Sequence, residues 1–403
     1  MQKKKIGLIP KLIAGIVLGI LLGYSTLILS IKGFESFEII MKIVVTLANF
    51  FSLFLKFIIP LMILAYITKG ISDLSQGAGK LLGFTTFVSY MSTLIAGTIA
   101  YIVAINLFPY FMANNVFTNL TDETAFIQPL FSIELNPLFD VTSAVVLAFL
   151  LGLSISTMKG KEIGYITYDF FTEFSIIITK VLNKAIIPFI PFYILSTFAN
   201  LTYSGQAFSI LSVLWKVFIT VIILHILYII AIFIFAGFIG KKNPLKLLKN
   251  QIPAYLTAIG TQSSAATIPI NLDCAKKNNT SPQIREFVIP LCANIHLAGS
   301  MITITSCVTS VLLMNNLDIN FGIIIPFILT LAVVMIAAPG APGGAIMSAV
   351  PFLSMVGIDP DGALAGLLIT LYITQDSFGT ACNVSGDNAI AIIVDNFYKK
   401  YIK

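Results

Sequence analysis

Long runs of apolar residues, each bounded by charged or turn-forming residues, dominate the pattern along this chain. A transmembrane helix needs about 20 consecutive, mostly apolar residues to cross a hydrocarbon core about 30 Å thick. Six such runs occupy 9–31, 39–68, 80–108, 141–158, 171–199 and 207–240. They predict six membrane-spanning helices. No small-residue cleavage site follows the first run, so we interpret it as a spanning helix and not as a signal peptide.

Lysine and arginine in the connecting segments predict the orientation of these helices, because both residues favour cytoplasmic loops. Basic segments alternate along the chain with loops that carry no lysine or arginine or are mainly acidic, such as 109–140. The basic N-terminus and the lysines of 241–249 both fall on the cytoplasmic side. We therefore expect a multi-pass protein of the inner (cytoplasmic) membrane with both termini in the cytoplasm.

The alternation of loop charges stops after residue 250. Segment 250–272 lies between two basic loops, so it begins and ends on one side, and a polar run lies at its centre. It predicts a re-entrant hairpin with its tip at Ser263 and Ser264. Such non-helical backbone is tolerated at membrane depth only where protein buries it or where it lines a cavity.

A second hairpin is predicted at 321–357. This stretch is too long for one helix, carries the sequence APGAPGG at Ala338–Gly344, and lies between loops on the opposite side. Opposed broken helices of this kind point to a midplane binding site in secondary transporters. Single spanning helices are expected at 287–313 and 362–396.

The last of these helices carries four polar residues at one spacing. Asp376, Thr380, Asn383 and Asp387 follow i, i+4, i+7 and i+11, which is one face of an α-helix. The two carboxylates are then roughly 16 Å apart along the axis. A charge at mid-membrane costs about 2.5–3.5 kcal/mol even on lenient insertion scales. This face is therefore expected to line a polar site that meets a cation.

Composition agrees with a helical membrane protein. Of the 403 residues, 57% are hydrophobic and only 10% are charged, whereas soluble domains are about 25% charged. The runs are too long for an outer-membrane barrel, and no basic tract suggests nucleic-acid binding. His225 lies alone in an apolar run and is expected to have a structural role. The cysteines lack metal-ligand spacing and are expected to be small buried residues: Cys274, Cys292, Cys307 and Cys382.

Four motifs of the C-terminal half resemble a known family. They are TQSSAATIPINL (261–272), IPLCANIHLAGSMITI (289–304), APGAPGGAIM (338–347) and QDSFGTACNVSGD (375–387). In this order they resemble the dicarboxylate/amino acid:cation symporters of the glutamate-transporter fold, and most closely the bacterial serine/threonine:sodium symporters. The N-terminal half matches only in its pattern of spans.

The resemblance implies an all-α polytopic membrane protein with eight transmembrane helices and two opposed re-entrant helical hairpins, arranged as inverted repeats. It implies a homotrimer in the lipid bilayer that works by an elevator mechanism. A scaffold and trimerisation domain would comprise 1–79 and 141–206. A transport domain would comprise 80–108 and 207–403.

The resemblance also implies a substrate site. The position of Asp376 holds the substrate α-amino group in this family, by a charge-assisted hydrogen bond. Asn383 would bind the α-carboxylate, helped by backbone N–H groups at the hairpin tips. Thr380 would contact the substrate side chain. The other implied substrate-site residues are Ser263, Ser264, Ser300, Ala341, Gly343 and Gly344.

Two further positions define the expected substrate. Gly379 stands where acidic-substrate members have an arginine that binds the side-chain carboxylate. Gln262 stands where some relatives, including the serine/threonine branch, have arginine. A second substrate carboxylate would therefore be desolvated without a counter-charge, at a cost of several kcal/mol. A neutral amino acid is expected.

Asp387 aligns with the sodium-binding carboxylate of the family. Backbone carbonyls of Cys292, His296 and Asn383 are implied to complete the site, since hard cations prefer oxygen ligands. His296 replaces a common asparagine. We expect only its carbonyl to enter the site, although a projecting imidazole would allow a proton-sensitive step. Ala298 replaces an aspartate of the glutamate branch, which implies fewer coupled sodium ions.

Three other functional classes share some of these sequence features. An intramembrane aspartyl protease needs two carboxylates about 3 Å apart, which positions roughly 16 Å apart on one helix cannot provide. A channel is compatible with the hairpins, but a zwitterion-sized site favours coupled transport. A sodium- or proton-coupled carrier of acidic amino acids or dicarboxylates is the closest alternative, and Gly379 and Gln262 argue against it. An enzyme is not expected.

Overall fold

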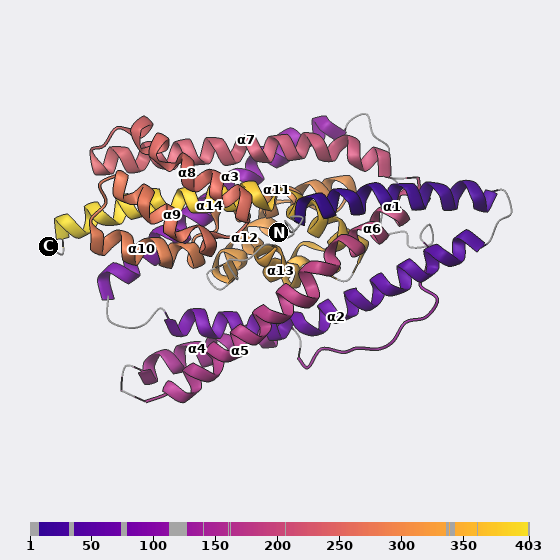
Figure 1. Cartoon of the computed structure of the whole chain (residues 1–403), viewed down its shortest axis with the longest axis horizontal. Coiled ribbons are helices and arrows are strands. Elements are labelled where there is room, and N and C mark those ends of the chain that lie inside the picture. The colour runs from indigo at the N-terminus through magenta and orange to yellow at the C-terminus, as the bar shows by residue number, and fades with distance from the viewer. Residues whose placement is uncertain are drawn as a thin grey trace, which may run out of the picture.

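In the computed structural model of the chain, every regular element of the described residues is helical (Figure 1). The described residues are 8–31, 36–73, 79–112, 127–139, 141–159, 161, 163–205, 207–335, 338, 343–360 and 362–401. The elements of the first half are α1 (Leu8–Ile31), α2 (Ser36–Asp73), α3 (Gly79–Met112), α4 (Val141–Lys159), α5 (Tyr165–Val181), α6 (Ile187–Tyr203) and α7 (Ala207–Gly240). The second half holds α8 (Pro244–Thr261), α9 (Ser264–Lys277), α10 (Pro282–Ile295), α11 (Ala298–Met314), α12 (Phe321–Val334), α13 (Gly344–Ala349) and α14 (Ala363–Tyr401).

The predicted spans agree with most of these helices, because long apolar runs satisfy their backbone hydrogen bonds internally only as helices. Among the described residues, five helical segments are long and apolar enough to cross a membrane: Glu38–Lys69, Lys80–Met112, Tyr165–Tyr203, Ile210–Gly240 and Pro282–Met314. The predicted total of eight spans remains a prediction. The chain is all-helical and multi-pass in character.

The predicted span at 171–199 is not one regular helix. It consists of α5, a π-helical turn at Leu182–Ile186, and α6. Pro188 lies near the start of α6, where its ring would clash with the carbonyl four residues earlier in an unbroken α-helix. The wider turn accommodates that proline within a continuous helical segment.

Helices α1, α2, α4, α5 and α6 pack on one another, α1 against α6 and α2 against α4 and α5. The closest packing in this group joins α1 to α6. A Cβ atom at Gly15, Gly19 or Gly23 would lie 2.3–2.5 Å from a backbone oxygen of α6. Glycines at this four-residue spacing allow two helix backbones to approach closely, as small residues do in membrane helices.

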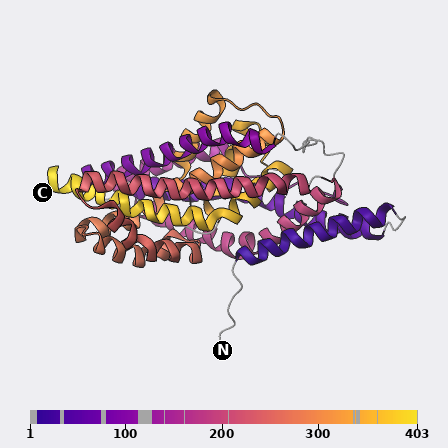
Figure 2. The same ribbon diagram turned by 90° about the horizontal axis from the view of Figure 1, so that it is seen from above.

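The remaining helices form a second group around α14. This helix packs against α7, α8 and α11, and α11 packs against α3. Figures 1 and 2 show that α7 and α14 run side by side along the long axis of the molecule. Figure 1 also shows that this second group extends past α2 at the end that carries the C-terminus.

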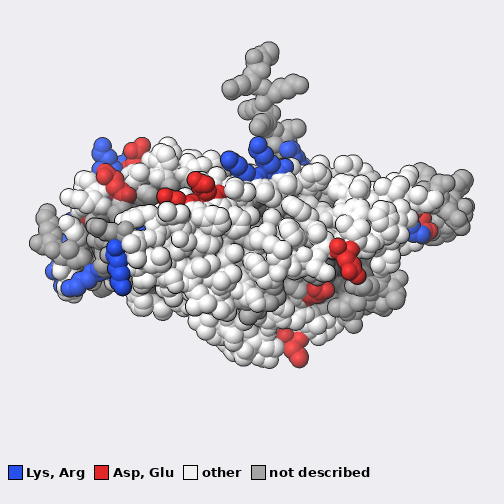
Figure 3. Space-filling view, turned by 90° about the horizontal axis from the view of Figure 1, so that it is seen from below, with Lys and Arg blue, Asp and Glu red and all other residues white. Residues whose placement is uncertain are grey.

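The surface is largely apolar. Figure 3 shows a face on which uncharged side chains cover most of the area, and its lysine and arginine side chains lie mainly toward the C-terminal end and at the middle of one edge. Large apolar side chains are exposed on several helices, for example Phe87 (60%), Leu150 (61%) and Phe238 (84%). Extensive exposed apolar surface is typical of proteins that contact lipid or other proteins.

Both predicted hairpin regions contain paired helical elements. Helices α8 and α9 pack side by side and are joined by Gln262 and Ser263, so the turn begins one residue before the predicted tip. Gln262 adopts φ +53°, a left-handed conformation that ends α8. In the second region α12 packs against a 3₁₀ helix at Val350–Val356, which directly follows α13.

The span predicted at 287–313 falls within Pro282–Met314, which is long and apolar enough to cross a membrane, but it is two helices and not one unbroken helix. Helix α10 ends at Ile295 and α11 begins at Ala298. His296 between them is extended, with φ −113° and ψ 101°. By contrast, α14 runs without interruption through Ala363–Tyr401, and it carries both carboxylates of the predicted polar face.

Candidate functional site

The predicted polar face of α14 points into the protein. Asp376, Thr380, Asn383 and Asp387 are all buried, at 5% exposure or less. Because α14 is one continuous helix, its rise separates the two carboxylates by roughly 16 Å. The expected common face is confirmed, and the spacing excludes a close carboxylate pair of the aspartyl-protease type.

Asp376 is held by neutral donors. Its Oδ2 accepts a hydrogen bond of 2.7 Å from the backbone N–H of Gly343, and its Oδ1 accepts one of 2.9 Å from the Tyr372 hydroxyl. Thr380 Oγ1 lies 3.5 Å from Oδ1. Gly343 precedes α13, so the second hairpin region contacts α14 at this carboxylate.

Tyr372 was not predicted as a site residue. Its hydroxyl oxygen also lies 3.0 Å from Ser300 Oγ, and the side chain is 1% exposed. The signal in the sequence was its spacing, because Tyr372 stands four residues before Asp376 and so lies on the same helix face. A tyrosine in an apolar helix is too common for that spacing alone to identify it.

Asn383 connects α14 to the break in the seventh span. Its Oδ1 accepts hydrogen bonds from the backbone N–H groups of Gly299 at 2.7 Å and Ser300 at 3.2 Å, so it caps the N-terminus of α11. Its Nδ2 donates to Ser300 Oγ at 3.0 Å. Asn383 is the residue predicted to bind the substrate α-carboxylate. Both polar atoms of its side chain therefore already have hydrogen-bond partners within the protein.

The first hairpin contacts α14 through its turn. Gln262 Nε2 donates to Ser377 Oγ at 2.9 Å, one residue after Asp376. Ser263 caps the N-terminus of α9, because its Oγ accepts a hydrogen bond of 3.2 Å from the backbone N–H of Ala266. Ser264, the first residue of α9, is buried. Of the predicted tip residues of the second hairpin, Ala341 lies outside the described residues, while Gly343 and Gly344 lie at the start of α13.

Gly379 has a packing role that the sequence did not predict. A Cβ atom there would lie 3.4 Å from Thr303 Oγ1 and 3.6 Å from Gly299. A Cβ at Gly299 would lie only 2.3 Å from the Gly379 carbonyl oxygen. The two glycines thus mark a close approach of α11 and α14. The Cβ atom of any side chain at position 379 would contact α11.

Asp387 lies against His296. The imidazole Nδ1 is 2.9 Å from Asp387 Oδ1, and both side chains are at most 1% exposed. The expectation that only the carbonyl of His296 enters this site was therefore wrong. The reason is the helix break, because the extended backbone at His296 turns the ring toward α14.

The surroundings of Asp387 suit a cation. Its Oδ2 is buried and has no hydrogen-bond partner among the described residues, and a buried charge is costly unless it is paired. Helix α10 ends here, so its last carbonyls supply partial negative charge. No cluster of three or more His, Cys, Asp or Glu forms in the described part of the chain.

The residues that were expected to be structural are buried. All four cysteines are free and buried. His225 on α7 is 1% exposed, and its Nε2 lies 3.0 Å from the Gly299 carbonyl oxygen and 3.1 Å from Thr303 Oγ1. His225 therefore joins α7 to α11 at the point where α11 meets α14.

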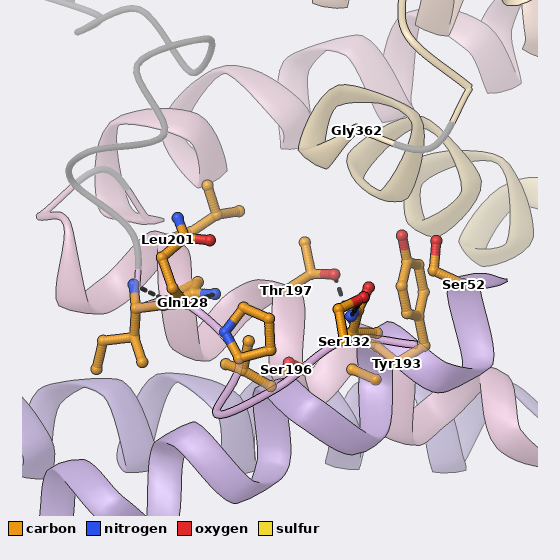
Figure 4. Close-up of a pocket in the computed structure, with 14 residues that line it drawn as sticks. Ser52, Gln128, Ser132, Tyr193, Ser196, Thr197, Leu201 and Gly362 are labelled. Atoms are coloured by element: carbon orange, nitrogen blue, oxygen red, sulfur yellow. Dashed lines mark hydrogen bonds between the residues drawn. The ribbon is translucent and has the colours of Figure 1, made fainter. Parts of the chain in front are cut away.

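A separate pocket of about 370 Å³ lies between α2, α6 and the segment Ile127–Ser132 (Figure 4). Its polar lining is uncharged. Asn49 donates to Ser132 Oγ at 3.1 Å, and Asn200 accepts from the backbone N–H of Ile127 at 3.1 Å. None of the predicted site residues lines this pocket, so it is distinct from the polar face of α14.

Comparisons with known proteins agree with this arrangement. The sodium:dicarboxylate symporter family matches residues 8–397. The chain is 29% identical over 268 residues to excitatory amino acid transporter 3 of Oryctolagus cuniculus, covering 66% of this chain and 50% of the relative. It is 30% identical over 261 residues to excitatory amino acid transporter 1 of Ambystoma tigrinum, covering 62% and 46%.

A human relative, excitatory amino acid transporter 5, is 33% identical over 180 residues, which are 44% of this chain and 31% of that protein. The chain thus spans about half the length, or less, of these curated relatives. By their names the relatives are transporters and not enzymes. The match over nearly the whole chain, together with the buried carboxylates Asp376 and Asp387 on α14, establishes that this protein belongs to the sodium:dicarboxylate symporter family.

Proposed function

We propose that this protein is a secondary active transporter that couples sodium entry to the uptake of small neutral amino acids, such as serine or threonine. The observation that carries the proposal is the lack of a cationic partner for Asp376. Its hydrogen-bond donors among the described residues are Gly343, Tyr372 and Thr380, and all three are neutral. A buried carboxylate with only neutral donors is suited to a substrate ammonium group.

The rest of the zwitterion would lie toward the helix termini beside Asp376. The N-terminus of α11 and the turns of both hairpins present backbone N–H groups, which favour a carboxylate. Ser263, Ser264 and Ser300 belong to these termini. Asn383 Nδ2 has two N–H donors and gives one to Ser300 Oγ, so the other could donate to the α-carboxylate.

The absence of a fixed positive charge favours a neutral substrate. Gln262 donates to Ser377, and Gly379 has no side chain. The ion pairs between described residues include Lys42–Glu38, Arg285–Glu286 and Lys399–Asp395, and none of these three involves Asp376. A second substrate carboxylate here would be buried without compensation.

Sodium is the proposed coupling ion, and the residues present fit it. Asp387 would supply a carboxylate oxygen, and Cys292, His296 and Asn383 would supply backbone carbonyls. A bound cation would compensate the buried charge of Asp387 and so favour the state that accepts substrate. The chain's own contribution is the placement of an unpartnered carboxylate oxygen beside the carbonyl end of a broken helix.

The proposed mechanism is an elevator motion in a homotrimer of the inner membrane, with both termini cytoplasmic and eight spans plus two re-entrant hairpins. The α1–α2 and α4–α6 packing group supports a scaffold of 1–79 and 141–206. The packing of α3 and of helices between α7 and α13 around α14 supports a moving unit of 80–108 and 207–403. The substrate and ion positions all fall in the second unit.

A second candidate is a sodium- or proton-coupled carrier of acidic amino acids or dicarboxylates. It is favoured by the name of the matching family and by the names of the excitatory amino acid transporters. It is opposed by the uncharged Gln262 and Gly379. The two candidates therefore differ in whether the site must hold a second substrate carboxylate.

Uptake into proteoliposomes distinguishes them. An inward sodium gradient is expected to drive accumulation of serine, threonine or alanine, and replacement of external sodium by choline is expected to abolish it. Accumulation that is unchanged in choline would contradict sodium coupling. Strong glutamate, aspartate or dicarboxylate uptake with little serine uptake would favour the second candidate.

A further inference from the structure

Four side chains from different parts of the fold, Ser92 and Tyr228 half-buried and His296 and Asp387 buried, form one hydrogen-bonded chain that ends on Asp387. Ser92 on α3 and Tyr228 on α7 contact each other through their hydroxyl groups. His296, in the break between α10 and α11, places Nε2 3.0 Å from Ser92 Oγ and 3.4 Å from the Tyr228 hydroxyl. Its Nδ1 lies 2.9 Å from Asp387 Oδ1.

The partners of the ring define its orientation. An ionised carboxylate only accepts hydrogen bonds, so the ring nitrogen that faces Asp387 carries a proton. The hydroxyl groups on the other side can donate or accept, so they hold Nε2. The imidazole is therefore hydrogen-bonded at both nitrogens and donates one N–H to one oxygen of Asp387.

Gly386 provides the space for this ring. A Cβ atom at that position would lie 2.3 Å from His296 Cε1 and 3.2 Å from Nδ1. Any residue larger than glycine at position 386 would displace the imidazole. The side chains of His296 and Asp387 are both buried, so the ring cannot move into solvent. The glycine and the histidine thus form a matched pair.

We propose that His296 is a positioning residue that fixes the Asp387 carboxylate, occupying Oδ1 and leaving Oδ2 for the coupling cation. This inference rests on the proposed sodium coupling and deepens it, because it assigns a role to a side chain that was expected to contribute only its carbonyl. Oδ2 is the buried oxygen that has no partner among the described residues. Residues that orient a metal ligand typically contribute about 10–100-fold to metal affinity.

Sodium binding to the purified full-length protein tests the proposal without depending on transport. Ligands that bind the folded state raise its unfolding temperature, so the sodium concentration at half-maximal stabilisation reports affinity, with choline chloride keeping ionic strength constant. His296→Leu is expected to raise that concentration about 10–100-fold. His296→Asn keeps an N–H near the position of Nδ1 and is expected to recover most of the loss.

A double-mutant cycle tests whether Gly386 provides the space for the His296 imidazole. Gly386→Ala is expected to raise the sodium midpoint about tenfold in the wild-type background. In the His296→Asn background it should add less than about twofold, because asparagine has no atom at the Cε1 position. Gly83→Ala on α3 is the matched control, since a Cβ there has no neighbour within 4 Å.

The outcomes separate the inference from the proposed function. A merely structural histidine would lower the unfolding temperature in choline and leave the sodium midpoint unchanged. A wild-type midpoint in folded His296→Leu, or equal effects of Gly386→Ala in both backgrounds, would overturn the positioning role alone. If sodium neither stabilises the wild-type protein nor drives uptake, the proposed coupling fails, and the inference fails with it.

Discussion

Asp376 and Asp387 are buried carboxylates on one face of α14 but have opposite kinds of surroundings. Asp376 accepts hydrogen bonds at both oxygens, from Gly343 and Tyr372. Asp387 accepts at one oxygen from His296, and its other oxygen has no partner among the described residues. Identical residue types on one surface thus differ in how much of their hydrogen-bonding capacity the protein itself fills.

The difference arises from the elements that meet α14 at each end of this face. At Asp376 the partner is the turn before α13, which offers an N–H group. At Asp387 it is the end of α10, where carbonyl oxygens are left over. Asn383 lies between the two and caps α11. The direction of each helix end therefore sets whether the neighbouring carboxylate meets an N–H donor or carbonyl oxygens.

Asp376→Asn is expected to have the largest effect of the substitutions that test the difference between the two carboxylates. Loss of the charge removes a desolvated, charge-assisted hydrogen bond to the substrate, so amino acid uptake should fall by roughly 100-fold or more. Sodium-dependent stabilisation should stay close to that of the wild-type protein. Uptake in proteoliposomes and unfolding temperature against sodium measure the two effects. Equal loss of both would contradict the division of roles between the carboxylates.

Asp387→Asn should produce the complementary result. Sodium midpoints should rise by about tenfold or more, since a neutral amide replaces the Asp387 carboxylate beside the end of α10. High sodium should restore part of the serine-dependent response. Titration of both ligands against thermal unfolding tests this expectation, and a loss of substrate response that high sodium cannot restore would place substrate contacts at Asp387.

Gln262→Arg should sharpen the comparison by adding the missing positive charge beside Asp376. Glutamate or aspartate should then compete for uptake about tenfold better, because their second carboxylate gains a counter-charge. Gln262→Met is the control, since it removes the hydrogen bond to Ser377 without adding charge. Competition that improves equally in both variants would show that charge at residue 262 does not define the substrate.

Tyr372→Phe and Tyr228→Phe give the smallest expected effects. Each removes one hydroxyl worth about 1 kcal/mol, or roughly fivefold in affinity. The first should weaken substrate binding only, because Tyr372 contacts Asp376. The second should weaken sodium binding only, because Tyr228 contacts His296. Matched titrations of serine and sodium measure both, and a crossed pattern would reject the assignment of these two hydroxyls.

Much of the fold followed from local pattern. The run at 207–240 coincides with α7, and the first hairpin turns one residue from its predicted tip. The interruption at His296 and Leu297 was not predicted, because neither residue is a glycine or a proline. The π-helical turn at Leu182–Ile186 was also missed, although it contains Asn183 and Lys184 and is followed by Pro188.

The sequence by itself determined that the chain is helical and apolar and that Asp376 and Asp387 share a face, because apolar runs and helical rise are local properties. Only the tertiary structure decided which groups each carboxylate meets. Gly343 lies 33 residues before Asp376, and His296 lies 91 residues before Asp387. Contacts over such separations depend on how α3, α7, α11 and the hairpins pack around α14, and that packing also placed the His296 imidazole against Asp387.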